Sequence, residues 1–130
     1  MTELLQLDFS QSDLANHIGV LSEQELDELD FGVIGFDAEG IVRRYNAFES
    51  KLAGLSPQRV LGHSLFATVA PCMNNFMVAQ RFEDAQKSDT VLDVTIDYVL
   101  TLRMLPKKVK LRLVAEPDAA LRYVLVCRPS

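Results

Sequence analysis

Two short segments of the sequence carry side chains that could take part in chemistry. Tyr45 and Glu49 stand four residues apart. On one helical turn this spacing directs a phenol and a carboxyl the same way. The second segment places the thiol of Cys72 directly after Pro71, whose ring restricts the backbone. We interpret the two segments as parts of one pocket that holds an organic cofactor.

The same side chains also have ordinary structural interpretations. A free cysteine most often packs as a small apolar residue, and a buried tyrosine usually packs its ring in the core with its hydroxyl bonded. A glutamate in the first turn of a helix commonly stabilises the helix dipole. Cys72, Tyr45 and Glu49 therefore indicate a binding site only as a set.

The two histidines do not indicate a metal site or an enzyme. His17 and His63 lie far apart in the sequence, so we expect no metal ion. His63 and Cys72 could be read as a nucleophile and its base in a hydrolase. No glycine-rich oxyanion turn and no third orienting residue accompany them, and we expect no enzymatic activity.

Length and composition predict one domain. A chain of 130 residues can bury roughly two-thirds of its unfolded surface without disulfides or metals. The first 42 residues hold no Lys or Arg, and no apolar run approaches the ~20 residues of a membrane span. We expect a cytoplasmic protein that does not bind membranes and is a monomer or weak dimer. We expect no structural disulfide between Cys72 and Cys127, and one free reactive thiol.

Charge is distributed unevenly along the chain. Residues 1–42 carry ten acids and no Lys or Arg, whereas residues 43–130 carry thirteen bases and eight acids. We expect the acidic N-terminal segment, with few large apolar residues, to lie over a basic part of the core and to have low local stability. Basic residues do not alternate with aromatics, so we expect no nucleic-acid partner.

The first half of the sequence predicts an N-terminal cap, a hairpin and several short helices. One helix is expected near residues 11–17, and a second begins at the capping box of Ser22 and Glu25. Apolar segments at 31–37 and 41–45 predict a β-hairpin. Helical segments should follow, first from Asn46 to Ala53 and then after Ser56, with a turn at 65–69.

The second half predicts one more helix and three strands. Apolar residues at helical spacing indicate a helix over 77–87, and residues 92–104 then alternate with a period of two. Turns lead into strands near 109–113 and 123–127. This order predicts an α+β fold with a five-stranded antiparallel sheet and helices on one face. We assign residues 1–28 to the cap and 29–130 to the core.

The sequence resembles the photoactive yellow protein family, whose members are small light-sensing PAS domains that carry p-coumaric acid as a cysteine thioester. The resemblance covers nearly the whole chain. The matching residues are Phe31-Gly32, 37–40, Tyr45-Asn46-Ala47 with Glu49, Gly62, 69–72 and 104–110.

The resemblance implies a role for each candidate site residue. Cys72 would carry the chromophore, and Tyr45 and Glu49 would donate hydrogen bonds to its phenolate oxygen. Glu49 would be protonated through burial. Light would isomerise the chromophore from trans to cis, and proton transfer from Glu49 would drive a signal to an unknown downstream protein. The expected pocket wall is formed by Leu65, Phe66, Val69, Leu100 and Met104.

Three positions depart from the family pattern. Ala53 stands where a threonine usually supports the tyrosine, and Leu55 stands where an arginine usually closes the pocket. Leu102 stands where a tyrosine commonly contacts the chromophore. Each change makes the pocket more apolar. An alternative function therefore stays open, a PAS module without pigment that regulates through protein contacts or a small apolar ligand.

Overall fold

A computed structural model of the protein describes residues 7–101 and 106–128. Its centre is a five-stranded antiparallel sheet with the strand order β2-β1-β5-β4-β3. The strands are β1 (Gly32–Phe36), β2 (Val42–Tyr45), β3 (Leu92–Leu100), β4 (Lys107–Ala115) and β5 (Arg122–Cys127). The predicted α+β class and antiparallel sheet are confirmed.

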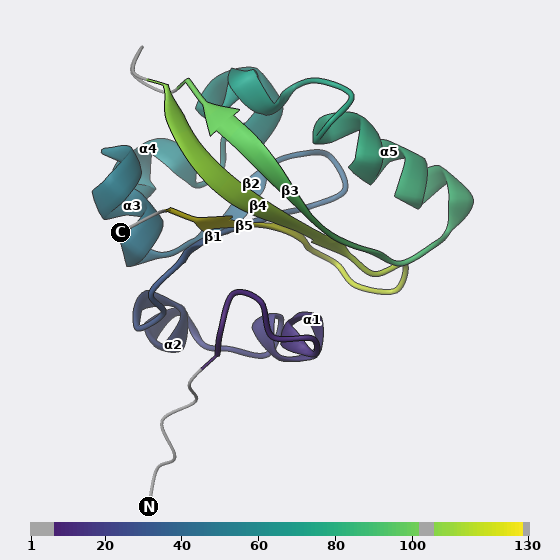
Figure 1. The fold of residues 1–130 in the computed structure, drawn as a ribbon, viewed down its shortest axis with the longest axis horizontal. Coiled ribbons are helices and arrows are strands. Elements are labelled where there is room, and N and C mark those ends of the chain that lie inside the picture. Colours follow the sequence, from purple (N-terminus) through teal and green to yellow (C-terminus); the bar gives the residue numbers. More distant parts are fainter. Residues whose placement is uncertain (1–6, 102–105, 129–130) are drawn as a thin grey trace, which may run out of the picture.

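Helices cover both faces of this sheet (Figure 1). One face carries α3 (Ala47–Ala53), α4 (Pro57–Val60) and α5 (Ala79–Ser88), together with the helical turns η1 (Leu65–Val69) and η2 (Pro71–Met73). The cap helices α1 (Leu14–Ile18) and α2 (Glu23–Asp27) lie against the opposite face. The sheet is therefore the middle of three layers.

Local capping signals fix the start and end of α3. The side chain of Asn46 accepts a hydrogen bond from the Glu49 amide at 3.1 Å, as expected of an N-cap residue. The helix ends at Gly54, which adopts the left-handed conformation with φ 75°. The predicted bounds of this helix are confirmed, and so is the capping box of Ser22 and Glu25.

Strand β3 shows the predicted alternation between a buried and a wet face. Tyr98 and Leu100 are buried, while Val99 between them is 47% exposed. Tyr98 pairs with Val109, and Leu100 pairs with Lys107. The described strand ends at Leu100. The predicted strand ran to residue 104, but Thr101 is not part of it, and residues 102–104 lie outside the described residues.

Two apolar clusters lie on the two faces of the sheet. The larger one fills the space between the sheet and α4, η1, η2 and α5. The smaller one joins the cap to the sheet through buried side chains of Leu7, Leu14, Ile18, Leu21, Leu26, Leu29, Phe31, Val33, Val114, Tyr123 and Leu125. The expectation that the cap carries few large apolar residues is therefore wrong.

Charge attraction between the cap and the core is also smaller than expected. Among the described residues, the pair of Arg44 and Glu23 is the one side-chain ion pair between cap and core. Arg44 also donates to the carbonyls of Ile18 and Leu21, and Arg112 donates to the carbonyls of Phe9 and Gln11. The basic side chains of the core thus bind the cap mainly at its backbone carbonyls. Among the described acidic side chains of the cap, Glu23 and Asp27 are bonded to the core.

Candidate functional site

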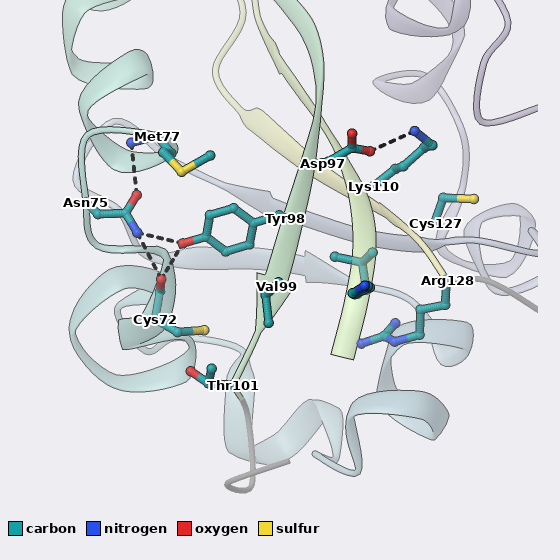
Figure 2. Close-up of a pocket in the computed structure, with 12 residues that line it drawn as sticks. Cys72, Asn75, Met77, Asp97, Tyr98, Val99, Thr101, Lys110, Cys127 and Arg128 are labelled. Atoms are coloured by element: carbon teal, nitrogen blue, oxygen red, sulfur yellow. Dashed lines mark hydrogen bonds and ion pairs between the residues drawn. The ribbon is translucent and has the colours of Figure 1, made fainter. Parts of the chain in front are cut away.

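Cys72 lies in η2, on the face of the sheet that carries α3, α4 and α5. Two side chains hold its backbone there (Figure 2). The hydroxyl of Tyr98 donates to the Cys72 carbonyl, and Nδ2 of Asn75 donates to the same oxygen at 3.1 Å. Asn75 Nδ2 also lies 2.6 Å from the Tyr98 hydroxyl oxygen. Its Oδ1 accepts from the amides of Met77 and Val78 at 2.9 and 3.2 Å. The loop that carries the thiol is therefore fixed to β3.

A groove of about 980 Å³ opens beside Cys72. Met77 and Asn75 line it from the loop that follows η2, and Tyr98 and Val109 line it from the strands. Its wall continues to Arg128, directly after β5. The groove has the size and the partly apolar lining of a small-molecule site, and both Cys72 and Cys127 line it.

Tyr45 is the last residue of β2, and its side chain is buried in the larger apolar cluster. Its hydroxyl is buried and has no hydrogen-bond partner among the described residues. Burial raises the pKa of Tyr45 well above its ordinary value, and the nearby Glu49 carboxylate adds to this increase. Tyr45 therefore stays a neutral phenol with one hydrogen bond to give.

Glu49 lies in the first turn of α3 and is 2% exposed. Its carboxylate is packed directly against β1, since a Cβ added at Gly32 would come within 2.0 Å of Glu49 Oε1. Glycine at position 32 is therefore required by the position of the carboxylate. Burial raises the pKa of Glu49, and the guanidinium of Arg128 opposes this shift.

Arg128 forms a two-pronged ion pair with Glu49. Its Nη1 and Nη2 lie 2.6 and 3.0 Å from the two carboxylate oxygens. Both oxygens accept, which is the arrangement of a charged carboxylate. The family resemblance implied a protonated Glu49 that donates a hydrogen bond. In the arrangement seen here Glu49 is an acceptor, so a donor role requires Arg128 to release it.

The predicted wall residues occupy one region of the core. Leu65, Val69 and Leu100 are buried in the same apolar cluster as Tyr45, and Phe66 and Cys72 pack against it. The described groove reaches Cys72 and Arg128 but is not lined by Tyr45, Glu49 or these apolar residues. Met104 and Leu102 lie outside the described residues. Ala53 is buried, and Leu55 packs against the cluster.

Sequence reasoning missed three residues of the site, namely Asn75, Tyr98 and Arg128. A signal existed for two of them. The alternation of β3 placed Tyr98 on the buried face. In β5, Val124 and Val126 are buried, and Arg128 is the next residue at the same two-residue spacing, so it is expected on the same face. Asn75 could have been found only as a typical turn residue before a helix.

Neither a metal site nor a membrane-spanning helix is found in the described ranges. No group of three or more His, Cys, Asp and Glu side chains there could hold a metal ion. Within the same ranges, no helix has the length and apolar character needed to cross a membrane.

The fold and the fixed cysteine loop define a PAS-type sensor domain. Structural comparison agrees: the photoactive yellow protein domain of the sensor histidine kinase Ppr from Rhodospirillum centenum matches with a TM-score of 0.79 and 33% identity, over 88% of this chain and 99% of that domain. A PAS domain of the RpfR receptor from Cronobacter turicensis, at 14% identity and a TM-score of 0.60, shares the fold alone.

Curated relatives show which family of PAS domains the chain resembles in sequence. Photoactive yellow proteins from Halochromatium salexigens and Rhodothalassium salexigens are 35% and 34% identical over 105 residues, which cover 81% of this chain and 83% of each relative. No family model matches the chain. At this identity and coverage the chain belongs to the photoactive yellow protein family, and it is a photoreceptor PAS domain, not an enzyme.

Proposed function

We propose that the protein is a light sensor that holds p-coumaric acid as a thioester on Cys72. The observation that carries the proposal is the buried hydroxyl of Tyr45, which has no partner among the described residues. A buried polar group without a partner costs about 1–3 kcal/mol. A ligand oxygen bonded to Tyr45 would recover that free energy, and the phenolic oxygen of p-coumaric acid is such an acceptor.

Each site residue then has a role in holding the ligand. Cys72 would supply the sulfur of the thioester, and Tyr98 and Asn75 would keep its loop in place. Tyr45 and Glu49 would bind the phenolate oxygen. The side chains around the aromatic ring would be Leu65, Phe66, Val69, Leu100 and Met104.

When bound, p-coumaric acid supplies absorption of blue light and a double bond that isomerises from trans to cis. Glu49 would then give its proton to the phenolate and become a buried carboxylate. An ionised group left in an apolar environment costs several kcal/mol. That free energy is available to loosen the cap and expose a signalling surface.

The setting of this sensor belongs to the same proposal. We place the protein in the cytoplasm, as a monomer or weak dimer that signals to a downstream protein. Neither nucleic acid nor membrane is part of this proposal.

A second function is favoured by a different observation. Each carboxylate oxygen of Glu49 accepts a hydrogen bond from Arg128, and Leu65 and Leu100 are 0% and 2% exposed. Such a core also suits a PAS module that works without pigment, through protein contacts or a small apolar ligand. In that case Cys72 would be chemically passive.

Reaction with an activated ligand separates the two functions. We expect incubation with p-coumaric anhydride to give a yellow adduct whose intact mass increases by one coumaroyl group. Cys72→Ala should abolish the adduct, whereas Cys127→Ala should leave it unchanged. No adduct, or an adduct located on Cys127, would contradict the light-sensor proposal.

A further inference from the structure

Arg128 is in contact with both Glu49 and the groove beside Cys72. The guanidinium binds both carboxylate oxygens of Glu49, and Arg128 lines the same groove as Cys72. Its side chain is 14% exposed, and that of Glu49 is 2% exposed. Among the described residues, no other Lys or Arg side chain is bonded to Glu49. Glu49 has a role in the sensor mechanism above, but its buried partner Arg128 has none there.

The backbone explains why an arginine reaches this position. Val124 and Val126 of β5 are fully buried, and Arg128 is the next residue in the same alternation. Gly32 of the neighbouring β1 leaves space for the carboxylate of Glu49. The planar guanidinium matches two carboxylate oxygens at once, which a lysine ammonium cannot do. The geometry is specific to an arginine and a carboxylate.

We propose that Arg128 and Glu49 form a stored ion pair that changes partners when a phenolic ligand is bound. Glu49 accepts the proton of the ligand phenol, and Arg128 becomes the counter-ion of the phenolate. The phenol O–H bond breaks, a new O–H bond forms on Glu49, and the net charge of the three groups stays the same. This inference rests on the proposed function, because it assigns the origin of the Glu49 proton.

The exchange avoids placing two anions together in a buried site. If Arg128 stayed on an ionised Glu49, a phenolate beside them would face a like charge. The other titratable group beside Glu49 is Tyr45, which burial keeps neutral. At the start of α3, Asp27 is exposed and accepts from the Ala47 amide at 2.7 Å. The arrangement therefore favours a ligand that arrives with a phenol proton over one that cannot give a proton.

The ion pair itself is tested on the protein without ligand. Infrared titration of the Glu49 carboxyl, assigned by difference from Glu49→Gln, should show a carboxylate at neutral pH. In Arg128→Gln the protonated fraction near neutral pH should rise at least about tenfold, because an adjacent cation typically lowers a carboxyl pKa by a unit or more. In Arg128→Lys the protonated fraction of Glu49 should lie between those of wild type and Arg128→Gln. The lysine variant keeps a buried positive charge, so it can be measured if Arg128→Gln folds poorly.

Lys110→Gln is the matched control. Lys110 lines the same groove, but it is bonded to Asp97 and not to Glu49. Its removal should leave the Glu49 titration unchanged. A Glu49 that is already protonated at neutral pH, or that titrates identically in wild type and Arg128→Gln, would overturn the stored ion pair.

The change of partners is tested with two ligands that differ in one proton. Loading with p-coumaric anhydride should convert the Glu49 carboxylate band into a carboxylic acid band. Loading with 4-methoxycinnamic anhydride, which forms the same thioester but has no phenol proton, should leave Glu49 ionised. A carboxylate that persists in the p-coumaroyl adduct would overturn the exchange while the sensor proposal stands. The absence of an adduct on Cys72 would contradict the sensor proposal. The titration without ligand would still show whether Arg128 keeps Glu49 ionised.

Discussion

At the scale of single residues, the site depends on a close approach between a glycine and a glutamate. Glu49 can lie beside β1 only because residue 32 has no Cβ. The approach holds the carboxylate where Arg128 reaches both of its oxygens. The sequence resemblance included Gly32, but its physical reason follows only from the structure.

Gly32→Ala should destabilise the protein by about 1–3 kcal/mol, because overpacking a buried site costs this much. The added Cβ would lie 2.0 Å from Glu49 Oε1, so the carboxylate must move away from Arg128. Chemical denaturation measures the loss. The control is Gly19→Ala, where no atom lies within 4 Å of the added Cβ. Equal stability of the two variants would contradict the role given to Gly32.

At the scale of elements, two short segments bring the candidate site together. Asn46 starts α3 and also binds the backbone of the cap, since its Nδ2 donates to the Leu26 carbonyl at 2.9 Å. The same nitrogen donates to the Phe31 carbonyl of the core at 3.0 Å. Asn75 and Tyr98 fix the loop of Cys72 to β3. Each segment depends on an asparagine that bonds to several backbone groups at once.

Loss of the Asn75 contacts should loosen the loop that carries Cys72. Asn75→Ala removes bonds to the Cys72 carbonyl and to two amides, whereas Tyr98→Phe removes only the hydroxyl. We expect faster reaction of Cys72 with a thiol reagent in both variants, with the larger increase in Asn75→Ala. Each lost hydrogen bond should cost about 0.5–1.5 kcal/mol of stability.

Tyr123→Phe is the control for this test. The Tyr123 hydroxyl binds Arg44 in the contact with the cap, on the other side of the sheet. Tyr123→Phe should leave the rate at which Cys72 reacts with the thiol reagent unchanged. A Cys72 thiol that reacts at the wild-type rate in Asn75→Ala would show that the loop is held by other contacts.

At the scale of the whole molecule, the cap is bonded directly to the element that carries Glu49. Asn46 accepts from the Glu49 and Val33 amides and donates to the Leu26 carbonyl of the cap, so a change at Glu49 has a short route to α2. Apolar packing and the arginines Arg44 and Arg112 hold the rest of the cap. Release of the cap must therefore expose apolar surface.

Light should increase hydrogen exchange in the cap more than in the sheet of the p-coumaroyl protein. A new carboxylate at Glu49 would disturb α3 and, through Asn46, the carbonyl contacts of α2. The amides of β3 that are bonded to β4 should stay protected, because β3 pairs with β4 from Leu92 to Leu100. Cap amides that exchange equally in dark and light, while β3 changes, would contradict this route.

The sequence predicted the elements better than their contacts. Caps, turns and the period of two are local properties, so the start of α3 at Asn46 and the wet face of β3 could be recognised. Uneven charge suggested how the cap is held, but the buried leucines and backbone carbonyls hold it instead. The pair of Glu49 and Arg128 joins residues 79 positions apart. Pairing over such a distance depends on the fold and not on spacing.

We propose that this protein senses light through a pigment on Cys72. The most direct measurement is the visible absorption of the p-coumaric anhydride adduct before, during and after blue illumination. We expect a yellow protein whose band bleaches in the light and recovers in the dark, and no such band in Cys72→Ala. A colourless protein, or a yellow adduct whose spectrum is the same in light and dark, would contradict the claim.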